Sequence, residues 1–205
     1  MRLLAISERT KADLLELYGV AEDRVVVTPL GVDSSFAPGE APDSYLLVVG
    51  SIEPRKDPLA AAAAARELGR PLVVVGPVRD QGLARELRAR GADLRGYVPK
   101  KELARLYRGA ACLVFPSRYE GFGLPLVEAM ASGTPVVAAP DAALREVAGE
   151  AAVFAEPDAL ADGVRRALAE RERLVAAGLE RARRFTWQET ARRTVAVYRE
   201  VLGLA

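Results

Sequence analysis

The stretch that decides the fold runs from Phe115 to Ala138 and reads FPSRYEGFGLPLVEAMASGTPVVA. It begins with an apolar strand end and a Pro-Ser turn, and Pro125 suits the first position of a helix that follows a glycine-containing loop. A Gly-Thr-Pro break then leads into another apolar run. This order of elements is typical of one unit of a parallel sheet covered by helices. Two carboxylates, Glu120 and Glu128, lie on the loop and on the helix.

Composition places the chain among globular proteins. It has 205 residues, of which 50% are hydrophobic, so it can bury a sizeable core. The net charge of +1 gives no global field that would favour nucleic acid as a partner. No apolar run reaches the roughly 18 residues of a membrane span, and the first apolar residues are too few for a signal peptide, so we expect a cytoplasmic protein. The single Cys112 excludes an internal disulfide, and histidine is absent.

Working outward from the opening stretch, apolar runs of strand length alternate with helical stretches. The strands are apolar on both faces, which predicts an α/β fold with a Rossmann-like, doubly wound parallel sheet of about six strands. The expected strands are Tyr45–Val49, Leu72–Val75, Asp93–Arg95, Cys112–Phe115, Val136–Ala138 and Ala152–Phe154. The expected helices between them are Pro58–Leu68, Gln81–Arg90, Lys101–Arg108, Pro125–Ala131 and Ala142–Val147.

Three parts are expected along the chain. Residues 1–44 hold a helix over Glu8–Tyr18, a strand over Arg24–Thr28 and a connector over Pro29–Ala41. Residues 45–185 form the sheet domain, which ends in helices over Asp158–Glu170 and Glu172–Arg184. Residues 186–205 begin with a capping box at Thr186 and form a last helix. An apolar stripe on that helix consists of Val195, Tyr198, Val201 and Leu202.

A ligand site is expected where the strand order reverses. With the common order 3-2-1-4-5-6, the first and fourth strands lie side by side, and ligands bind beyond their carboxyl ends. The loops there are Gly50–Lys56 and Pro116–Leu124. Gly50 allows a close backbone approach, and Arg55 and Lys56 can neutralise a diphosphate. These two cations could equally be a solvated pair after a proline turn. The G-x-G-x-x-G and P-loop patterns are absent, which argues against a nicotinamide-dependent dehydrogenase.

The second loop adds groups that suit the rest of such a ligand. The amides of Gly123 and Leu124 precede a helix N-terminus, where phosphate binds readily. Carboxylates beside a diphosphate must face neutral groups, and Glu120 and Glu128 can accept hydrogen bonds from sugar hydroxyls. A nucleotide sugar meets both requirements. The alternative is that Glu120 is solvated and that Glu128 complements the helix dipole.

The segment from Glu120 to Val137, EGFGLPLVEAMASGTPVV, closely resembles the E-x7-E signature of GT-B glycosyltransferases of family 4. The resemblance covers nearly the whole chain. Supporting stretches are Val48–Lys56, Gly96–Val98, the set Leu103, Leu106 and Tyr107, Val114–Ser117, Leu144–Val147 and Thr28–Asp33. One departure is Ser51, where many members carry arginine, and the G-[ST]-[LI]-E-P-R-K pattern resembles a subgroup often linked to mannosyl or rhamnosyl transfer.

The resemblance implies a role for each matching residue. Glu128 would hold the donor ribose hydroxyls, and Glu120 would hold the transferred sugar together with the backbone of Phe122, Gly123 and Leu124. Arg55 and Lys56 would hold the diphosphate and stabilise it as a leaving group. Tyr97 and Val98 would border the nucleobase.

The resemblance also implies what the chain does and what it lacks. The intact enzyme would be a retaining hexosyltransferase that uses a nucleoside-diphosphate sugar as substrate and no cofactor. No D-x-D triplet occurs, so no divalent metal is expected. Family members have two Rossmann-like domains, and this chain matches only the donor-binding half of a GT-B fold. We therefore expect little or no transfer activity from the chain alone. The last helix would pack toward the missing N-terminal acceptor domain.

Two alternatives concern partners. The chain could be a non-catalytic nucleotide-sugar-binding subunit that requires a separate partner carrying the acceptor domain. Contact with an anionic membrane would need a set of arginines to face it, although a solvated helix face explains them as well. These are Arg181, Arg183, Arg184, Arg192 and Arg193.

Overall fold

A parallel sheet forms the centre of the molecule. The structure is a computed structural model that describes residues 1–39 and 43–204. Within these ranges, six strands pair in the order β5-β4-β3-β6-β7-β8, and every pair is parallel. This is the predicted order 3-2-1-4-5-6, and the predicted fold class is confirmed. The strands are β3 (Tyr45–Val49), β4 (Leu72–Val75), β5 (Asp93–Gly96), β6 (Ala110–Phe115), β7 (Val136–Ala138) and β8 (Val153–Phe154).

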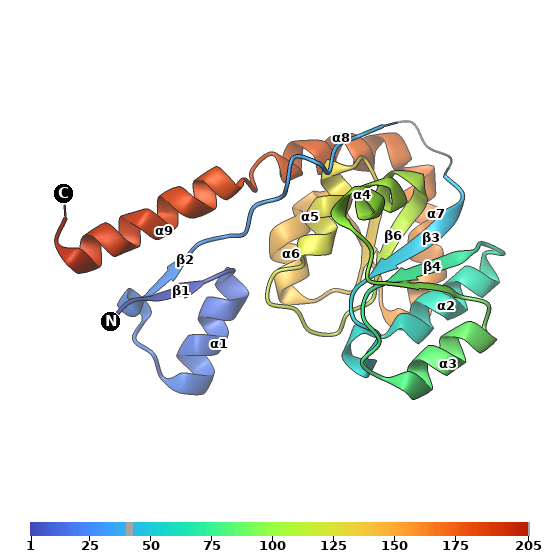
Figure 1. The fold of residues 1–205 in the computed structure, drawn as a ribbon, viewed down its shortest axis with the longest axis horizontal. Helices are drawn as coiled ribbons and strands as arrows, with labels where there is room; N and C mark the ends of the chain where they lie inside the picture. Colours follow the sequence, from blue (N-terminus) through green and yellow to red (C-terminus); the bar gives the residue numbers. More distant parts are fainter. Residues whose placement is uncertain (40–42, 205) are drawn as a thin grey trace.

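Helices cover both faces of this sheet (Figure 1). Because side chains alternate along a strand, Leu47 of β3 joins the core on one face, whereas Leu46 and Val48 join the core on the other. The first face is covered by α4 (Lys100–Gly109), α5 (Leu124–Ala131) and α6 (Ala142–Ala148). The second is covered by α2 (Pro58–Glu67), α3 (Gln81–Ala89) and α7 (Leu160–Ala169), and α8 (Arg171–Ala182) packs on α5.

A second, smaller unit precedes the sheet domain. Strands β1 (Leu3–Ala5) and β2 (Val25–Val27) pair in parallel, and α1 (Glu8–Tyr18) connects them. The sequence predicted α1 and its Ser7 cap, whose side chain accepts from the Thr10 amide. It did not predict β1, because three residues carry too little pattern. Helix α9 (Trp187–Leu202) returns alongside this unit (Figure 1).

The apolar stripe of α9 is largely exposed. Val197 is buried, whereas Val195, Tyr198 and Val201 are 46%, 58% and 56% exposed. Exposed large apolar side chains that gather on one helix indicate a surface that another protein segment covers.

Two chain segments cross in close contact beside the sheet domain: the connector that follows β2, and the segment that joins α8 to α9. The amide of Val32 donates to the carbonyl of Phe185 at 3.0 Å. A Cβ atom on Gly31 would lie 2.2 Å from the backbone nitrogen of Trp187, so only glycine fits at this crossing. Residues 40 and 41 of the expected connector, and the last residue of the expected C-terminal part, lie outside the described residues.

Several element boundaries differ from the predicted ones. Helix α5 begins at Leu124, one residue before the proline that was expected to open it. The expected helix over Asp158–Glu170 starts with a 3-10 turn at Pro157–Ala159. None of the helices in residues 1–39 and 43–204 has both the length and the apolar character needed to cross a bilayer.

Candidate functional site

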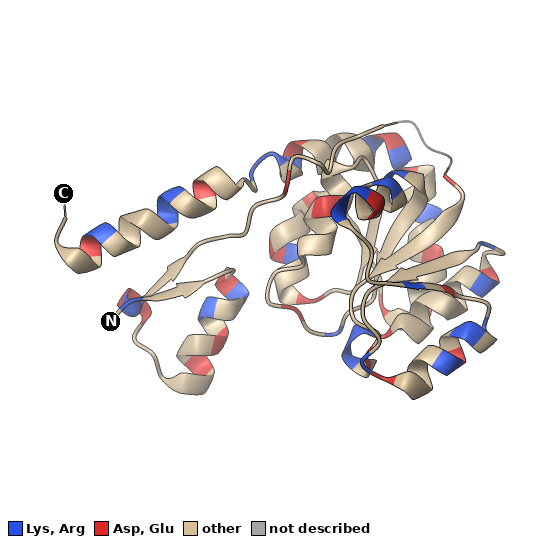
Figure 2. Ribbon diagram, viewed as in Figure 1, with Lys and Arg blue, Asp and Glu red and all other residues tan. Residues whose placement is uncertain are grey.

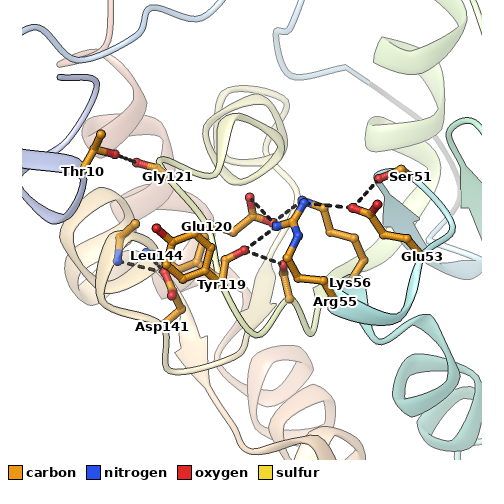
Figure 3. Close-up of polar contacts among 12 residues, drawn as sticks. Thr10, Ser51, Glu53, Arg55, Lys56, Tyr119, Glu120, Gly121, Asp141 and Leu144 are labelled. Atoms are coloured by element: carbon orange, nitrogen blue, oxygen red, sulfur yellow. Dashed lines mark hydrogen bonds and ion pairs between the residues drawn. The ribbon is translucent and has the colours of Figure 1, made fainter. Parts of the chain in front are cut away.

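The two predicted loops meet at the carboxyl ends of β3 and β6, which are neighbours in the sheet. The Arg118 amide donates to the carbonyl of Arg55 at 3.0 Å, and the Arg55 guanidinium donates to the carbonyl of Tyr119 at 2.5 Å. Figure 3 shows Arg55 and Lys56 of the first loop converging with Tyr119 and Glu120 of the second. The loops therefore form one continuous wall. Gly50 directly follows the end of β3, and its amide donates to the carbonyl of Val75 at 2.9 Å.

Glu120 lies between the two cations of the first loop. The residue is only 9% exposed, its carboxylate forms an ion pair with Lys56 Nζ, and Arg55 Nη1 lies 3.8 Å from its other oxygen. Arg55 also pairs with Glu53 at 2.9 Å. A carboxylate this buried needs a countercharge, and the adjacent loop supplies one. The expectation that Glu120 faces neutral groups beside a bound diphosphate stays a prediction. The ammonium of Lys56 also lies 5.3 Å from the centre of the Phe115 ring.

Glu128 has a different environment. It points from the second turn of α5, and its Oε2 accepts a hydrogen bond from the buried Tyr107 hydroxyl at 2.8 Å. Burial raises the pKa of Glu128 to about 7, although the Tyr107 hydroxyl and Lys100 act in the opposite direction. A residue that only complements a helix dipole would lie in solvent, so the partial burial of Glu128 and its bond to Tyr107 argue against that alternative.

The start of α5 requires glycine at position 123. Gly123 precedes the helix with a φ of +94°, and a Cβ atom there would lie 2.5 Å from Leu144 Cδ2. Pro125 has no N–H, so the backbone donors at this turn are those of Gly123 and Leu124. The side chain of Phe122 is 3% exposed and packs edge-to-face on Phe185, which leaves only its backbone for a ligand.

A hollow of about 250 Å³ lies beside Glu128. The predicted residues Tyr97, Val98 and Leu124 line it, and Tyr97 is 86% exposed. Sequence reasoning missed the other lining residues, although Lys100 follows closely on the predicted pair. Trp187 carried no signal, because it comes from the distant end of the chain. The missed residues are Gly31, Asp33, Phe36, Lys100, Leu103 and Trp187.

The small N-terminal unit also contacts the second loop. The hydroxyls of Ser7 and Thr10 both donate to the carbonyl of Gly121, the latter at 3.2 Å (Figure 3). The Tyr119 hydroxyl donates to Asp13 at 2.6 Å. The start of α1 therefore occupies the carbonyl of Gly121.

The N-terminus of helix α1 also binds a carboxylate of the sheet domain. The amides of Glu8 and Arg9 donate to the two oxygens of Glu146 on α6, at 2.9 and 3.2 Å. No sequence pattern predicted this contact, which joins the small unit to the sheet domain on the same side as the Gly121 contact.

Charged side chains are interspersed on the helices, and the central strands β3, β4 and β6 carry none (Figure 2). Arg192 and Arg193 both bind Glu189 at 2.7 Å, and Arg184 lies 3.6 Å from Glu180. Arg181 donates to two backbone carbonyls. Most of the arginines considered for a membrane surface therefore have partners within the chain. Within the described ranges, no group of three or more Asp, Glu or Cys side chains could hold a metal ion.

Comparisons with known proteins find relatives along nearly the whole chain. The family model described as glycosyl transferases group 1 matches residues 34–185. An O-antigen chain mannosyltransferase B from Escherichia coli is 31% identical over 228 residues, which cover 96% of this chain and 60% of the relative. A D-inositol 3-phosphate glycosyltransferase from Frankia alni is 36% identical over 243 residues, which cover 100% of this chain and 60% of the relative.

Solved structures show the same fold. A sucrose-phosphate synthase from Thermosynechococcus elongatus superposes with a TM-score of 0.83 at 24% identity, over 98% of this chain and 58% of that one. Anabaena HepE in complex with UDP and glucose has a TM-score of 0.80 at 16% identity, over 99% of this chain and 63% of that one. At these identities the likeness shows the fold alone. The chain spans about 60% of the length of the curated relatives named above.

Proposed function

The chain belongs to the glycosyl transferases of group 1, and we propose that it is the donor-binding domain of a hexosyltransferase, which binds a nucleoside-diphosphate sugar. The observation that carries the proposal is the placement of two cations, a helix N-terminus and two glutamates around one pair of adjacent strand ends. Each group matches one part of such a ligand.

The diphosphate would bind to Arg55, Lys56 and the amides of Gly123 and Leu124. As the bond to the anomeric carbon breaks, negative charge develops on the leaving diphosphate, and these donors would stabilise it. The turn into α5 sets the positions of the two amides, so they need little reorganisation, whereas Lys56 must leave its ion pair with Glu120 to reach the diphosphate.

The two glutamates would bind the two sugars of the ligand. Glu128 lines the hollow and would accept hydrogen bonds from the ribose hydroxyls, with the nucleobase next to Tyr97 and Val98. Glu120 would contact the transferred sugar. In the unliganded chain Lys56 pairs with Glu120. A bound diphosphate competes for this ammonium, which frees the carboxylate for sugar hydroxyls.

Transfer would require a second domain. The chain spans about 60% of its relatives, and the exposed stripe of α9 lies beside the small unit β1-α1-β2. We propose that an acceptor-binding domain packs there and that the chain alone transfers little sugar. By resemblance the transfer would retain the anomeric configuration without a metal ion.

A second candidate function is supported by the same exposed stripe. The chain could be a non-catalytic nucleotide-sugar-binding subunit whose partner supplies the acceptor domain. Size-exclusion chromatography with light scattering distinguishes the enzyme-domain hypothesis from the subunit hypothesis, because a subunit of this kind should co-purify with its partner. A strictly monomeric chain with no partner would argue against it.

Calorimetric titration tests the main proposal. The chain is titrated with UDP, GDP and ADP and with the corresponding nucleotide sugars, and we expect heat from one base and from its sugar derivative. The absence of heat from all of them would contradict the proposed function.

A further inference from the structure

A tyrosine outside the E-x7-E motif contacts the motif's second carboxylate. Tyr107 lies on α4, is fully buried, and donates its hydroxyl hydrogen to Glu128 Oε2 at 2.8 Å. Among the described residues, it is the only hydrogen-bond donor that contacts this carboxylate. Oε1 therefore remains available for a ligand in the hollow that Glu128 lines.

The packing around Tyr107 fixes the position of its hydroxyl. Its ring packs edge-to-face on Phe36, with the ring centres 5.7 Å apart, and its carbonyl accepts a hydrogen bond from Thr134 at 2.7 Å. Phe36 itself lines the same hollow. Because ring and backbone are both held, the hydroxyl cannot follow Glu128 to another rotamer. Glu128 must instead adopt the rotamer that meets the hydroxyl.

From this geometry we propose that Tyr107 is a positioning residue, which holds the Glu128 carboxylate in the orientation that accepts hydrogen bonds from the ribose hydroxyls of the donor. The inference rests on the proposed function. In this proposal ribose binding depends on two side chains, Tyr107 on α4 and Glu128 on α5. Tyr107 acts on the ligand only through Glu128.

The charge state of Glu128 gives a second consequence of the same contact. The groups that face it are Tyr107 and Lys100, both on α4, and Asp33 on the connector, and Asp33 pairs with Lys100 at 2.6 Å. Burial keeps the pKa of the Tyr107 phenol well above its ordinary value, so the phenol stays a donor at neutral pH. Its hydrogen bond favours the ionised carboxylate. Removing it therefore raises the pKa of Glu128 above its value of about 7.

The first experiment compares Tyr107→Phe with the wild-type chain by calorimetry. The probes are UDP, GDP or ADP, whichever the wild-type chain binds, and the dideoxyribose analogue of that nucleotide. Tyr107→Phe removes one hydrogen bond that orients a charged acceptor, so the affinity for the ribonucleotide should fall about tenfold. The analogue has no ribose hydroxyls, and its affinity should not change.

Tyr45→Phe is the matched control. The Tyr45 hydroxyl donates to the carbonyl of Leu106 on the same helix at 2.7 Å, and Tyr45 is also partly buried. This variant loses a comparable hydrogen bond without touching Glu128, so its affinities for both probes should equal those of the wild-type chain. Circular dichroism checks that both variants are folded.

Two results would overturn the inference in this experiment. An equal loss for the ribonucleotide and its dideoxy analogue would show that Tyr107 only supports the fold around the site. Unchanged ribonucleotide affinity in Tyr107→Phe would show that Glu128 does not depend on it.

A second measurement needs no ligand and separates this inference from the proposed function. The pKa of Glu128 is followed by NMR of carboxyl-labelled protein, and Tyr107→Phe should raise it while Tyr45→Phe leaves it in place. An unchanged pKa would overturn the positioning role even if nucleotides bind. If the wild-type chain binds none of the three nucleotides, the proposed function and the ribose assignment both fail, whereas a raised pKa would still support the contact.

Discussion

The two ends of the E-x7-E segment place the same residue type in opposite surroundings. Glu120, on the loop, has Lys56 beside one carboxylate oxygen and Arg55 at 3.8 Å from the other. Glu128, on the helix, has a phenol hydroxyl at 2.8 Å and is buried enough for its pKa to rise to about 7. The first carboxylate is balanced by charge, and the second is held by a neutral donor.

This difference separates two ways of preparing a site for a ligand. At the Glu120 end, the proposed diphosphate would have to replace an existing ion pair and would take the place of the Glu120 carboxylate at Lys56. At the Glu128 end, the partly buried carboxylate accepts one hydrogen bond, from Tyr107, so ribose hydroxyls would add hydrogen bonds without breaking any. Substitutions at the two ends should therefore have different and separable effects.

The largest effect is expected from Glu128→Ala. It removes the proposed acceptor for both ribose hydroxyls, so the affinity for the nucleoside diphosphate and for the nucleotide sugar should each fall about 100-fold, as calorimetry would measure. The control is Glu102→Ala, since the Glu102 side chain is 44% exposed and lies on the neighbouring helix. A loss confined to the nucleotide sugar would contradict the ribose assignment.

Glu128→Gln should have the next largest effect, on stability. Because the pKa of Glu128 is raised in the folded state to about 7 from an ordinary 4.5, its neutral form contributes stability that is complete below 4.5 and is lost as the pH rises through 7. A glutamine at this position cannot ionise, so the Glu128→Gln variant does not lose this stability as the pH rises. The variant should gain on the order of 2 kcal/mol in unfolding free energy over wild type near pH 8 and nothing near pH 4.

Urea unfolding at both pH values measures this difference, and Glu102→Gln serves as the control. An equal stability change at the two pH values would show that Glu128 is not buried in its ionised form. The gain would also identify Glu128 as a residue that costs stability for the sake of binding.

Lys56→Met should have a smaller effect, on diphosphate binding. It removes one of the two cations and leaves Glu120 without its partner next to the ligand, so the affinity for the bare nucleoside diphosphate should fall about tenfold. The exposed Lys101 provides the control variant Lys101→Met. Unchanged affinity in Lys56→Met would contradict diphosphate binding by Lys56 and would leave it only as the ion-pair partner of Glu120.

The smallest effect, and one of opposite sign, is expected from Glu120→Gln. It releases Lys56 from its ion pair, so the bare nucleoside diphosphate should bind about threefold more tightly, while the nucleotide sugar loses its charged acceptor and binds more weakly. Glu86→Gln, which removes an ion pair with Arg90 on α3, should change neither affinity. Weaker binding of the bare nucleotide would contradict the competition for Lys56.

The fold could be predicted from the sequence because the information is local. Apolar runs such as Leu72–Val75 are long enough to identify strands, and the helices between them require parallel crossovers. The six-strand order then places Gly50–Lys56 beside Pro116–Leu124. Strand β1 was missed because Leu3–Ala5 is too short to show a period.

The contacts that distinguish the two glutamates could not be predicted in the same way. Tyr107 lies on a different helix from Glu128, and its hydroxyl meets the carboxylate only after α4 and α5 pack together. The pairing of Lys56 with Glu120 likewise depends on two loops that are 64 residues apart in sequence. Residue type and spacing identify both carboxylates as candidates, but only tertiary packing determines what each one faces.

The most direct test of this division is the ratio of affinities for a nucleotide sugar and for its bare nucleoside diphosphate. Calorimetry would measure this ratio in the wild-type chain, in Glu128→Ala and in Glu120→Gln. We predict that Glu128→Ala lowers both affinities and leaves the ratio unchanged, whereas Glu120→Gln lowers the ratio. Equal losses for both ligands in both variants would contradict the separate roles of the two glutamates.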